Sequence, residues 1–143
     1  MKCAFYKATL PGVQGLYSRL VRFIDRGAYS HCELVFSDGM SASSSFLDRG
    51  VRFKQIDFDP AKWDIVEVTG DEKSARQWFN AHAGQPYDLI GTARFIFGVI
   101  PPSQKKWFCS EAVAAALGMN EPWRYGPCGL FAALSVPSLI DRQ

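Results

Sequence analysis

A cysteine in a context that favours thiol chemistry lies late in the sequence. Cys109 follows the bulky residues Trp107 and Phe108 and precedes a run of small residues that Gly118 closes. Because Ala and Leu favour a helix and Gly favours its end, Cys109 is expected at or just before a helix N-terminus. The unpaired backbone N–H groups there stabilise an anion, which would lower the pKa of the thiol and favour the reactive thiolate. The pattern is typical of a cysteine nucleophile, and an inert cysteine at a helix start shows the same pattern.

A base for this thiol is available in the segment 29–36, which is interpreted as a strand. Strand alternation places His31 and Glu33 on the same face, where the carboxylate can accept a hydrogen bond from the imidazole. A carboxylate in that position favours the protonated ring, which in turn pairs with a thiolate. His82 lies on the apolar face of a predicted helix and is interpreted as a packed structural residue. The resulting hypothesis is a pair of Cys109 and His31, oriented by Glu33.

The third polar group of such a triad has more than one candidate. The dipeptide Asp38-Gly39 favours a two-residue turn, which would place Ser44 opposite Glu33 on the returning strand. In a different register, the hydroxyl near the imidazole would belong to Ser43 or Ser45. Glu33 is the preferred choice, because a carboxylate orients an imidazole more strongly than a hydroxyl does.

Hydrophobic periodicity predicts both strands and helices around these residues. Strands are expected over residues 3–8, 29–36, 40–46, 51–58 and 63–68. Helices are expected over 13–26, after a capping-box pattern at 69–72, over 89–99, from Cys109 onward, and in a short segment ending near 134. Because the chain shows no repeat, low-complexity tract or linker, a single domain over residues 1–143 is expected.

The helix expected over 13–26 has two interpretations. Its apolar residues recur at helical spacing, and Arg19, Arg22 and Arg26 occupy the other side. The favoured interpretation is a surface helix whose apolar side packs on the sheet. A basic amphipathic helix that touches anionic lipid is the alternative.

Composition limits the class of protein. The 143 residues are 48% hydrophobic and 21% charged, which suits one folded domain with its own core. The net charge of +2 is too small to indicate a nucleic-acid partner. The four cysteines form no Cys-x-x-Cys motif, and no apolar run reaches the roughly 18 residues of a membrane span. With no secretory signal visible, a cytoplasmic location is expected.

Two motifs together resemble the signature of a known enzyme family. Gly84-Gln-Pro-Tyr87-Asp-Leu-Ile-Gly91 is followed downstream by Phe108-Cys109-Ser110-Glu111. This combination resembles the region around the nucleophile of the NlpC-type, papain-like cysteine hydrolases, which runs Gly-x-Pro-Tyr-x-x-Gly and then a helix-opening Cys-Ser. In the standard members the histidine follows the cysteine, whereas here His31 precedes it. That order is similar to the circularly permuted, YiiX-like branch, which is distantly related to the lecithin retinol acyltransferases.

The resemblance implies an α+β fold in which an antiparallel sheet packs against helices, as in a permuted papain-like domain. It implies Cys109 as the nucleophile and His31 as the base. Tyr87 matches the motif tyrosine, an active-site wall that hydrogen-bonds near the thiol. Tyr87 and Ser110 are accordingly the expected substrate-binding residues. In relatives the third polar residue often lies on the strand after the histidine, where this chain supplies only serines.

The expected function is hydrolysis of an amide or ester through a Cys–His acyl-enzyme, without a metal or organic cofactor. The substrate would be a peptide, a cell-wall peptide or a lipid acyl group, and the apolar segment 89–100 would line an acyl groove or fill the core. An acyltransferase would use the same two residues and pass the acyl group to an amine or alcohol. A non-catalytic binding module that kept the fold is the alternative from a different class. The oligomeric state is left open.

Overall fold

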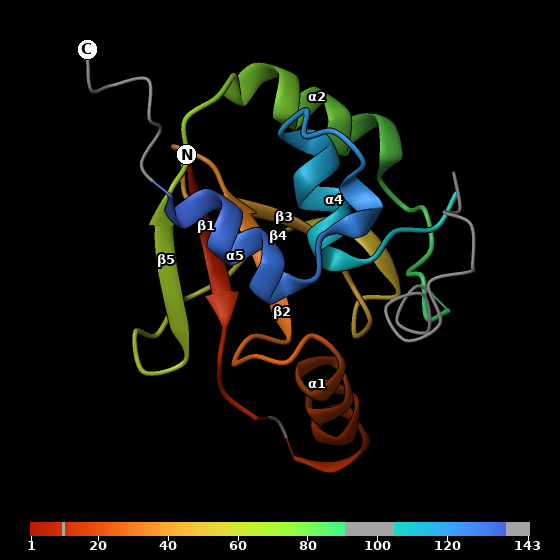
Figure 1. Cartoon of the computed structure of the whole chain (residues 1–143). Coiled ribbons are helices and arrows are strands. Elements are labelled where there is room, and N and C mark those ends of the chain that lie inside the picture. Colours follow the sequence, from red (N-terminus) through yellow and green to blue (C-terminus); the bar gives the residue numbers. More distant parts are fainter. Residues whose placement is uncertain (10, 91–104, 137–143) are drawn as a thin grey trace.

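Five strands form one antiparallel sheet in the spatial order β4-β3-β2-β1-β5 (Figure 1). They are β1 (Lys2–Tyr6), β2 (His31–Val35), β3 (Met40–Ser45), β4 (Gly50–Gln55) and β5 (Trp63–Glu67). The computed structural model describes residues 1–9, 11–90 and 105–136, and each predicted strand is present there with its ends shifted by a few residues. The α+β class with an antiparallel sheet is therefore confirmed.

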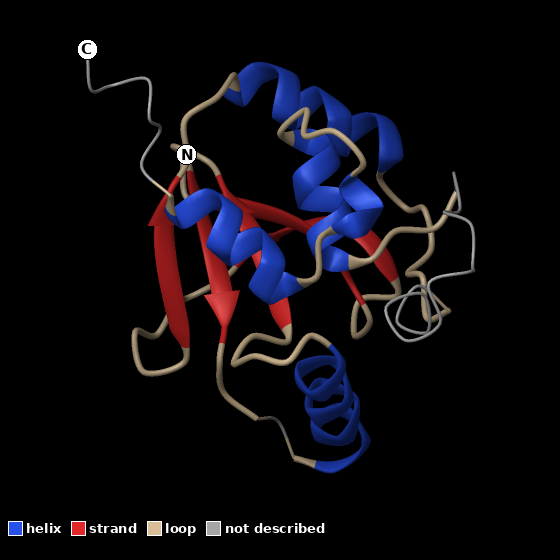
Figure 2. Cartoon of the chain, viewed as in Figure 1, coloured by secondary structure: helices blue, strands red, loops and turns tan. Residues whose placement is uncertain are grey.

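Helices cover one face of this sheet, and a further helix lies beyond its end (Figure 2). The covering helices are α2 (Glu72–His82), α4 (Cys109–Ala116) and α5 (Pro127–Ser135). Helix α1 (Gly12–Ile24) lies beyond the end at which β1 finishes and β2 begins. Most of the helix expected over 89–99 lies outside the described residues. Within the part of the chain that the structure describes, no helix is long and apolar enough to cross a membrane.

Alternation along the strands separates an apolar face from a polar one. On the helix-covered face, Phe5 of β1 meets Phe131 of α5 with ring centroids 5.2 Å apart. Phe53 of β4 meets Phe79 of α2 with ring centroids 6.2 Å apart. Burial of these apolar side chains holds α2 and α5 on the sheet. Cys32 is the partner of Phe5 in the sheet, so His31, one position earlier in β2, places its side chain on the opposite face.

The hairpin between β2 and β3 has a three-residue loop, and this corrects the predicted register. The loop comprises residues 37–39, and Gly39 adopts a left-handed φ of 84°, as three-residue hairpins favour. Continuation of the observed register aligns Glu33 with Ser43. The prediction that Ser44 lies opposite Glu33 is therefore wrong, because the extra loop residue shifts the returning strand by one position.

The start of α2 also differs from the prediction. The capping box expected at 69–72 is absent, and the helix is capped by Asp71, whose carboxylate accepts from the backbone N of Lys73 at 3.0 Å. The carboxylate of Glu72 instead accepts from the backbone N of Ser37 at 3.1 Å. Contacts between distant segments therefore decide which residue caps this helix.

Helix α4 begins with Cys109, as the sequence predicts. The backbone N of Phe108, the N-cap residue, donates to the carboxylate of Glu111 at 3.3 Å. Gly118 lies just past the helix with a left-handed φ of 70°, which ends the helix without strain. This confirms that Cys109 sits in the first turn of a helix.

Gly50 joins β4 to the segment that carries Tyr87, and we expect Gly50→Ala to destabilise the fold. Gly50 has a φ of +154°, and a Cβ atom there would lie 2.2 Å from the carbonyl oxygen of Gln85. Overlap with the backbone should lower the free energy of unfolding by about 2 kcal/mol or more, measured by urea denaturation. Gly129→Ala is the control, because nothing lies within 4 Å of its Cβ position. In the helix α5 it should be neutral or stabilising, and equal destabilisation by both changes would contradict this account.

Candidate active site

His31, the first residue of β2, is held by a fully buried carboxylate. Its Nε2 atom lies 2.7 Å from Oε1 of Glu33, and Glu33 is 0% exposed. Both side chains belong to the face of the sheet opposite the α2, α4 and α5 helices. The structure therefore brings His31 and Glu33 together, and the carboxylate fixes the orientation of the ring.

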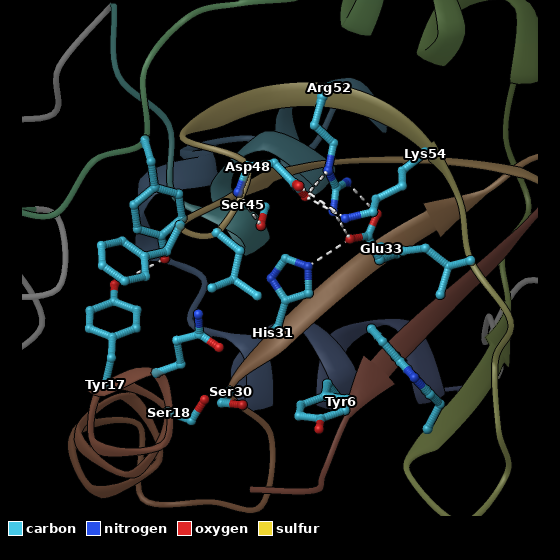
Figure 3. A pocket seen from close by; sticks show the side chains of 16 residues that line it. Tyr6, Tyr17, Ser18, Ser30, His31, Glu33, Ser45, Asp48, Arg52 and Lys54 are labelled. Carbon is cyan, nitrogen blue, oxygen red and sulfur yellow. Dashed lines mark hydrogen bonds and ion pairs between the residues drawn. The ribbon is translucent and has the colours of Figure 1, made fainter. Parts of the chain in front are cut away.

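Glu33 also binds the guanidinium of Arg52 with both oxygens. Arg52 Nη1 donates to Oε2 at 2.8 Å, and Nη2 donates to Oε1 at 2.5 Å. Arg52 reaches Glu33 from β4 across the small side chain of Ser43, its partner in β3. Arg52 Nε donates to Asp48 at 2.8 Å. Figure 3 shows the resulting chain of charges, from Asp48 through Arg52 and Glu33 to His31.

These contacts keep Glu33 ionised and His31 protonated. Burial works to raise the pKa of Glu33, but hydrogen bonds from His31 and Arg52 outweigh it and hold that pKa below its usual range. Burial works to lower the pKa of His31, but hydrogen bonds with Cys109 and Glu33 raise it to about 9. Each group stabilises the charged form of its neighbour. At neutral pH the ring of His31 is therefore an imidazolium.

Cys109 is fully buried in α4, which packs against β2, and it lies close enough to His31 for each to influence the pKa of the other. Burial raises the pKa of the Cys109 thiol well above its usual range, and a hydrogen bond with Cys32 adds to the rise, whereas His31 lowers it. The expectation that the helix start lowers this pKa is therefore wrong, because desolvation of the thiolate outweighs the helix dipole. His31 is the neighbour that favours the thiolate.

A pocket of about 240 Å³ opens beside His31 (Figure 3). Aromatic and aliphatic side chains form one part of its wall, and polar and charged side chains form the rest. The aromatic and aliphatic side chains include Tyr6, Phe46, Leu47, Ile56 and Trp63. His31 and Tyr87 also line the pocket, and both interact with Cys109, which does not line it. A molecule in the pocket would therefore reach the buried sulfur past these two side chains.

A buried hydroxyl in this pocket has no partner. Ser30, directly before His31, is 6% exposed, and its Oγ makes no hydrogen bond within the described chain. In Figure 3, Ser30 lies between His31 and Ser18 of α1. An unpaired buried hydroxyl costs free energy, so Ser30 is available to a polar atom of a molecule that enters the pocket.

Tyr87 lies between the pocket and the thiol. Its hydroxyl oxygen is 3.0 Å from that of Tyr17 in α1. Burial raises the pKa of Tyr87 well above its usual range, and the neighbouring Cys109 and Tyr17 add to the rise. The ring of Tyr17 also stacks on Phe46, with centroids 4.9 Å apart. Tyr87 thus lies close to Cys109 and is hydrogen-bonded to Tyr17 of α1.

Ser110 occupies a different environment from the pocket wall. It is fully buried, and its hydroxyl donates to the carbonyl oxygen of Tyr125 at 2.6 Å. The side chain therefore fastens the segment after α4, and it is not among the residues that line the pocket.

The serines of β3 do not contact the imidazole. Ser43 donates to a main-chain carbonyl of β2 at 2.7 Å, and Ser44 donates to the carbonyl oxygen of Trp107 at 2.7 Å. Ser45 lines the pocket, and its hydroxyl accepts from a loop N–H at 3.4 Å. Of the candidates for the third polar group, Glu33 is the one that the described contacts join to the ring.

The second histidine has a structural environment, in line with its interpretation from the sequence. His82 Nδ1 lies 2.7 Å from the carbonyl oxygen of Trp78, and the two rings stack with centroids 4.0 Å apart. His82 does not line the pocket.

Sequence reasoning missed Arg52, Tyr17 and Ser30. Arg52 had a usable signal, because a charged residue in the middle of a predicted strand needs a partner on its own face. The correct hairpin register would have aligned Arg52 with Glu33 across Ser43. Tyr17 and Ser30 gave no such signal, since their neighbours come from distant parts of the chain.

The fold and the site together define an α+β protein in which His31, held by the buried carboxylate of Glu33, lies beside a pocket and influences the pKa of the buried Cys109 thiol. Comparison of the chain with protein-family models and with curated proteins finds no match. Among residues 1–9, 11–90 and 105–136, no group of three or more His, Cys, Asp or Glu side chains is arranged to hold a metal ion.

Proposed function

We propose that this chain is a cysteine hydrolase that cleaves an amide or ester through an acyl-enzyme, within a circularly permuted papain-like domain. Cys109 is the nucleophile, His31 the acid and base, and Glu33 the group that orients the ring. The substrate is a peptide, a cell-wall peptide or a lipid acyl group. The element order supports the permutation, since the strand with His31 precedes the helix that begins with Cys109.

The observation that carries the proposal is the environment of His31. Its ring contacts a buried carboxylate and faces a pocket, and the buried thiol of Cys109 is among the groups that raise its pKa. Titratable groups with strongly perturbed pKa values beside a cavity are typical of active sites. A thiol, an imidazole that favours its thiolate, and a carboxylate that orients the imidazole are the parts that nucleophilic catalysis by cysteine requires.

In the proposed reaction, His31 and Cys109 exist as an imidazolium and a thiolate when the substrate is bound. The sulfur forms a bond to the substrate carbonyl carbon, and the carbonyl oxygen takes up negative charge near the first N–H groups of α4. His31 gives its proton to the leaving nitrogen or oxygen as that bond breaks. Water then attacks the thioester carbon and gives a proton to His31. The carbon–sulfur bond breaks, so that the acid leaves and the Cys109 thiolate is restored.

Labelling with a thiol-directed acyl probe tests this assignment. We expect the native chain to be acylated at Cys109 and Cys109→Ser to remain unlabelled, as measured by intact mass and peptide mapping. His31→Ala should slow acylation by about 10²-fold or more, because the thiolate loses the group that stabilises it. Thermal unfolding of each variant shows whether it keeps the native fold.

Cys128→Ser is the matched control. Cys128 is more exposed than Cys109, but burial raises the pKa of its thiol to about 11, and no imidazole is among the groups that act to lower it, as His31 does for Cys109. This variant should be labelled like the native chain. Labelling that is lost in Cys128→Ser and kept in Cys109→Ser would refute the proposal, because it would report exposure alone. A folded native chain that no acyl probe modifies would favour the binding module.

A further inference from the structure

Helix α1 presents bulky apolar side chains to solvent. They are Val13, Leu16, Leu20 and Phe23. Leu16 is 67% exposed and Phe23 is 82% exposed. The favoured expectation from the sequence was that these side chains pack on the sheet, and for this face of the helix that expectation is wrong. Their spacing of three, four and three residues aligns them along one face.

The contacts that hold α1 come from its other side. Val21 is buried, Ser18 is nearly so, and Tyr17 stacks on Phe46 and hydrogen-bonds with Tyr87. These residues bury one flank of the helix and leave the face with Leu16 and Phe23 open. A helix of 13 residues is only marginally stable in water without packing of its apolar face. Burial of this exposed face in an apolar environment would therefore stabilise the helix.

Two loops whose neighbouring residues contact α1 also expose apolar side chains. Leu47 and the pair Leu89-Ile90 are about half exposed. Each of them lies within three residues of a side chain that contacts Tyr17. Apolar surface that gathers around one element is typical of an interaction site, whereas single exposed apolar residues are ordinary.

The charged residues of helix α1 itself have one sign. The helix Gly12–Ile24 contains arginines and no acidic residue. Arg19 lies one turn from both Leu16 and Phe23, so its guanidinium borders the apolar face. The carboxylate of Asp25, the nearest acid in the sequence, accepts from the backbone N of Cys128 at 2.6 Å. The rim of the surface therefore suits anionic groups.

We propose that α1 and its flanking loops dock this chain on an anionic lipid bilayer. The apolar face enters the boundary between headgroups and acyl chains, and Arg19 binds lipid phosphates. A second copy of the chain fits this surface less well. Two such faces would bring their arginines together, and neither α1 helix has a carboxylate to pair with them. The proposal is independent of the hydrolase assignment.

Sedimentation with vesicles tests the proposal. The native chain should sediment with vesicles of phosphatidylcholine and phosphatidylglycerol more strongly than with phosphatidylcholine alone. Phe23→Glu should weaken binding by about tenfold or more, since it removes a large apolar group from the membrane. Arg19→Gln should weaken binding to the anionic vesicles by about fivefold. Ile65→Glu, at an exposed apolar residue of β5, is the matched control and should bind like the native chain.

Three results would overturn the proposal. The first is a failure of the vesicle assay, in which the native chain sediments with neither kind of vesicle or Phe23→Glu binds as strongly as the native chain. The second is a native dimer in analytical ultracentrifugation that Phe23→Glu converts to a monomer, with no vesicle binding; the surface would then belong to a second copy. The third is a lower thermal unfolding midpoint in Phe23→Glu but not in Ile65→Glu, because the face would then be buried within the chain.

Discussion

Glu33→Ala is expected to lower the free energy of unfolding by about 3–5 kcal/mol at neutral pH. The change removes the carboxylate that accepts from His31 and from Arg52. The side chains of these two groups are only 22% and 16% exposed. Two mostly buried cations would then lose the carboxylate that they share, and Asp48 would remain as the counter-charge of Arg52 alone, which is far worse than the loss of a surface ion pair. Urea denaturation of the native and variant chains measures the difference.

Glu67→Ala is the control for this prediction. Glu67 lies 3.6 Å from Lys2 and its side chain is 77% exposed, so its loss should change stability by no more than about 0.5 kcal/mol. The combined change Glu33→Ala and Arg52→Ala should be less destabilising than the sum of the single changes, because it removes one of the stranded cations. A Glu33→Ala variant as stable as Glu67→Ala would contradict the charge network.

Between pH 6.5 and pH 9 the free energy of unfolding should fall by about 3 kcal/mol. Burial disfavours the charged ring of His31, but its hydrogen bonds with Cys109 and Glu33 raise its pKa from 6.5 to about 9 in the folded chain. The folded state therefore holds this proton more tightly than the unfolded state does. The stabilisation is complete below the unfolded pKa and is lost as the pH rises through the folded pKa.

His31→Gln tests the origin of this pH dependence. Its unfolding free energy should fall much less than that of the native chain over the same window, because glutamine does not titrate and only groups such as the thiols of Cys109 and Cys128, whose pKa values are also raised, still contribute near pH 9. Parallel curves for the native and variant chains would show that another group is responsible. In the acid range, both chains should lose stability, because Glu33 has a pKa below its usual range and must be protonated as the fold is lost.

Much of the architecture and part of the site follow from local patterns. Period-two alternation predicts the strands and places His31 and Glu33 on one face, because that relation depends only on backbone pleating. The small-residue run closed by Gly118 predicts that a helix begins at Cys109, because propensity and capping act within one or two turns. The sequence predicts a two-residue hairpin loop, but the loop has three residues, so the partner of Glu33 is Ser43 and not the expected Ser44.

Other features of the site depend on residues that meet only in the folded chain. Arg52 was not foreseen, because its contact with Glu33 requires the register of three strands. The pKa of Cys109 was expected to fall and instead rises, because desolvation depends on what covers the thiol and not on its neighbours in sequence.

The sequence by itself determined most of the elements and the choice of candidate site residues, since backbone periodicity and capping are properties of short segments. Only the tertiary structure decided that Cys109 lies close enough to His31 to influence its pKa, that Arg52 binds Glu33, and that the apolar face of α1 stays exposed. The physical reason is that proximity, burial and desolvation are set by packing between segments distant in the chain, which local patterns do not encode.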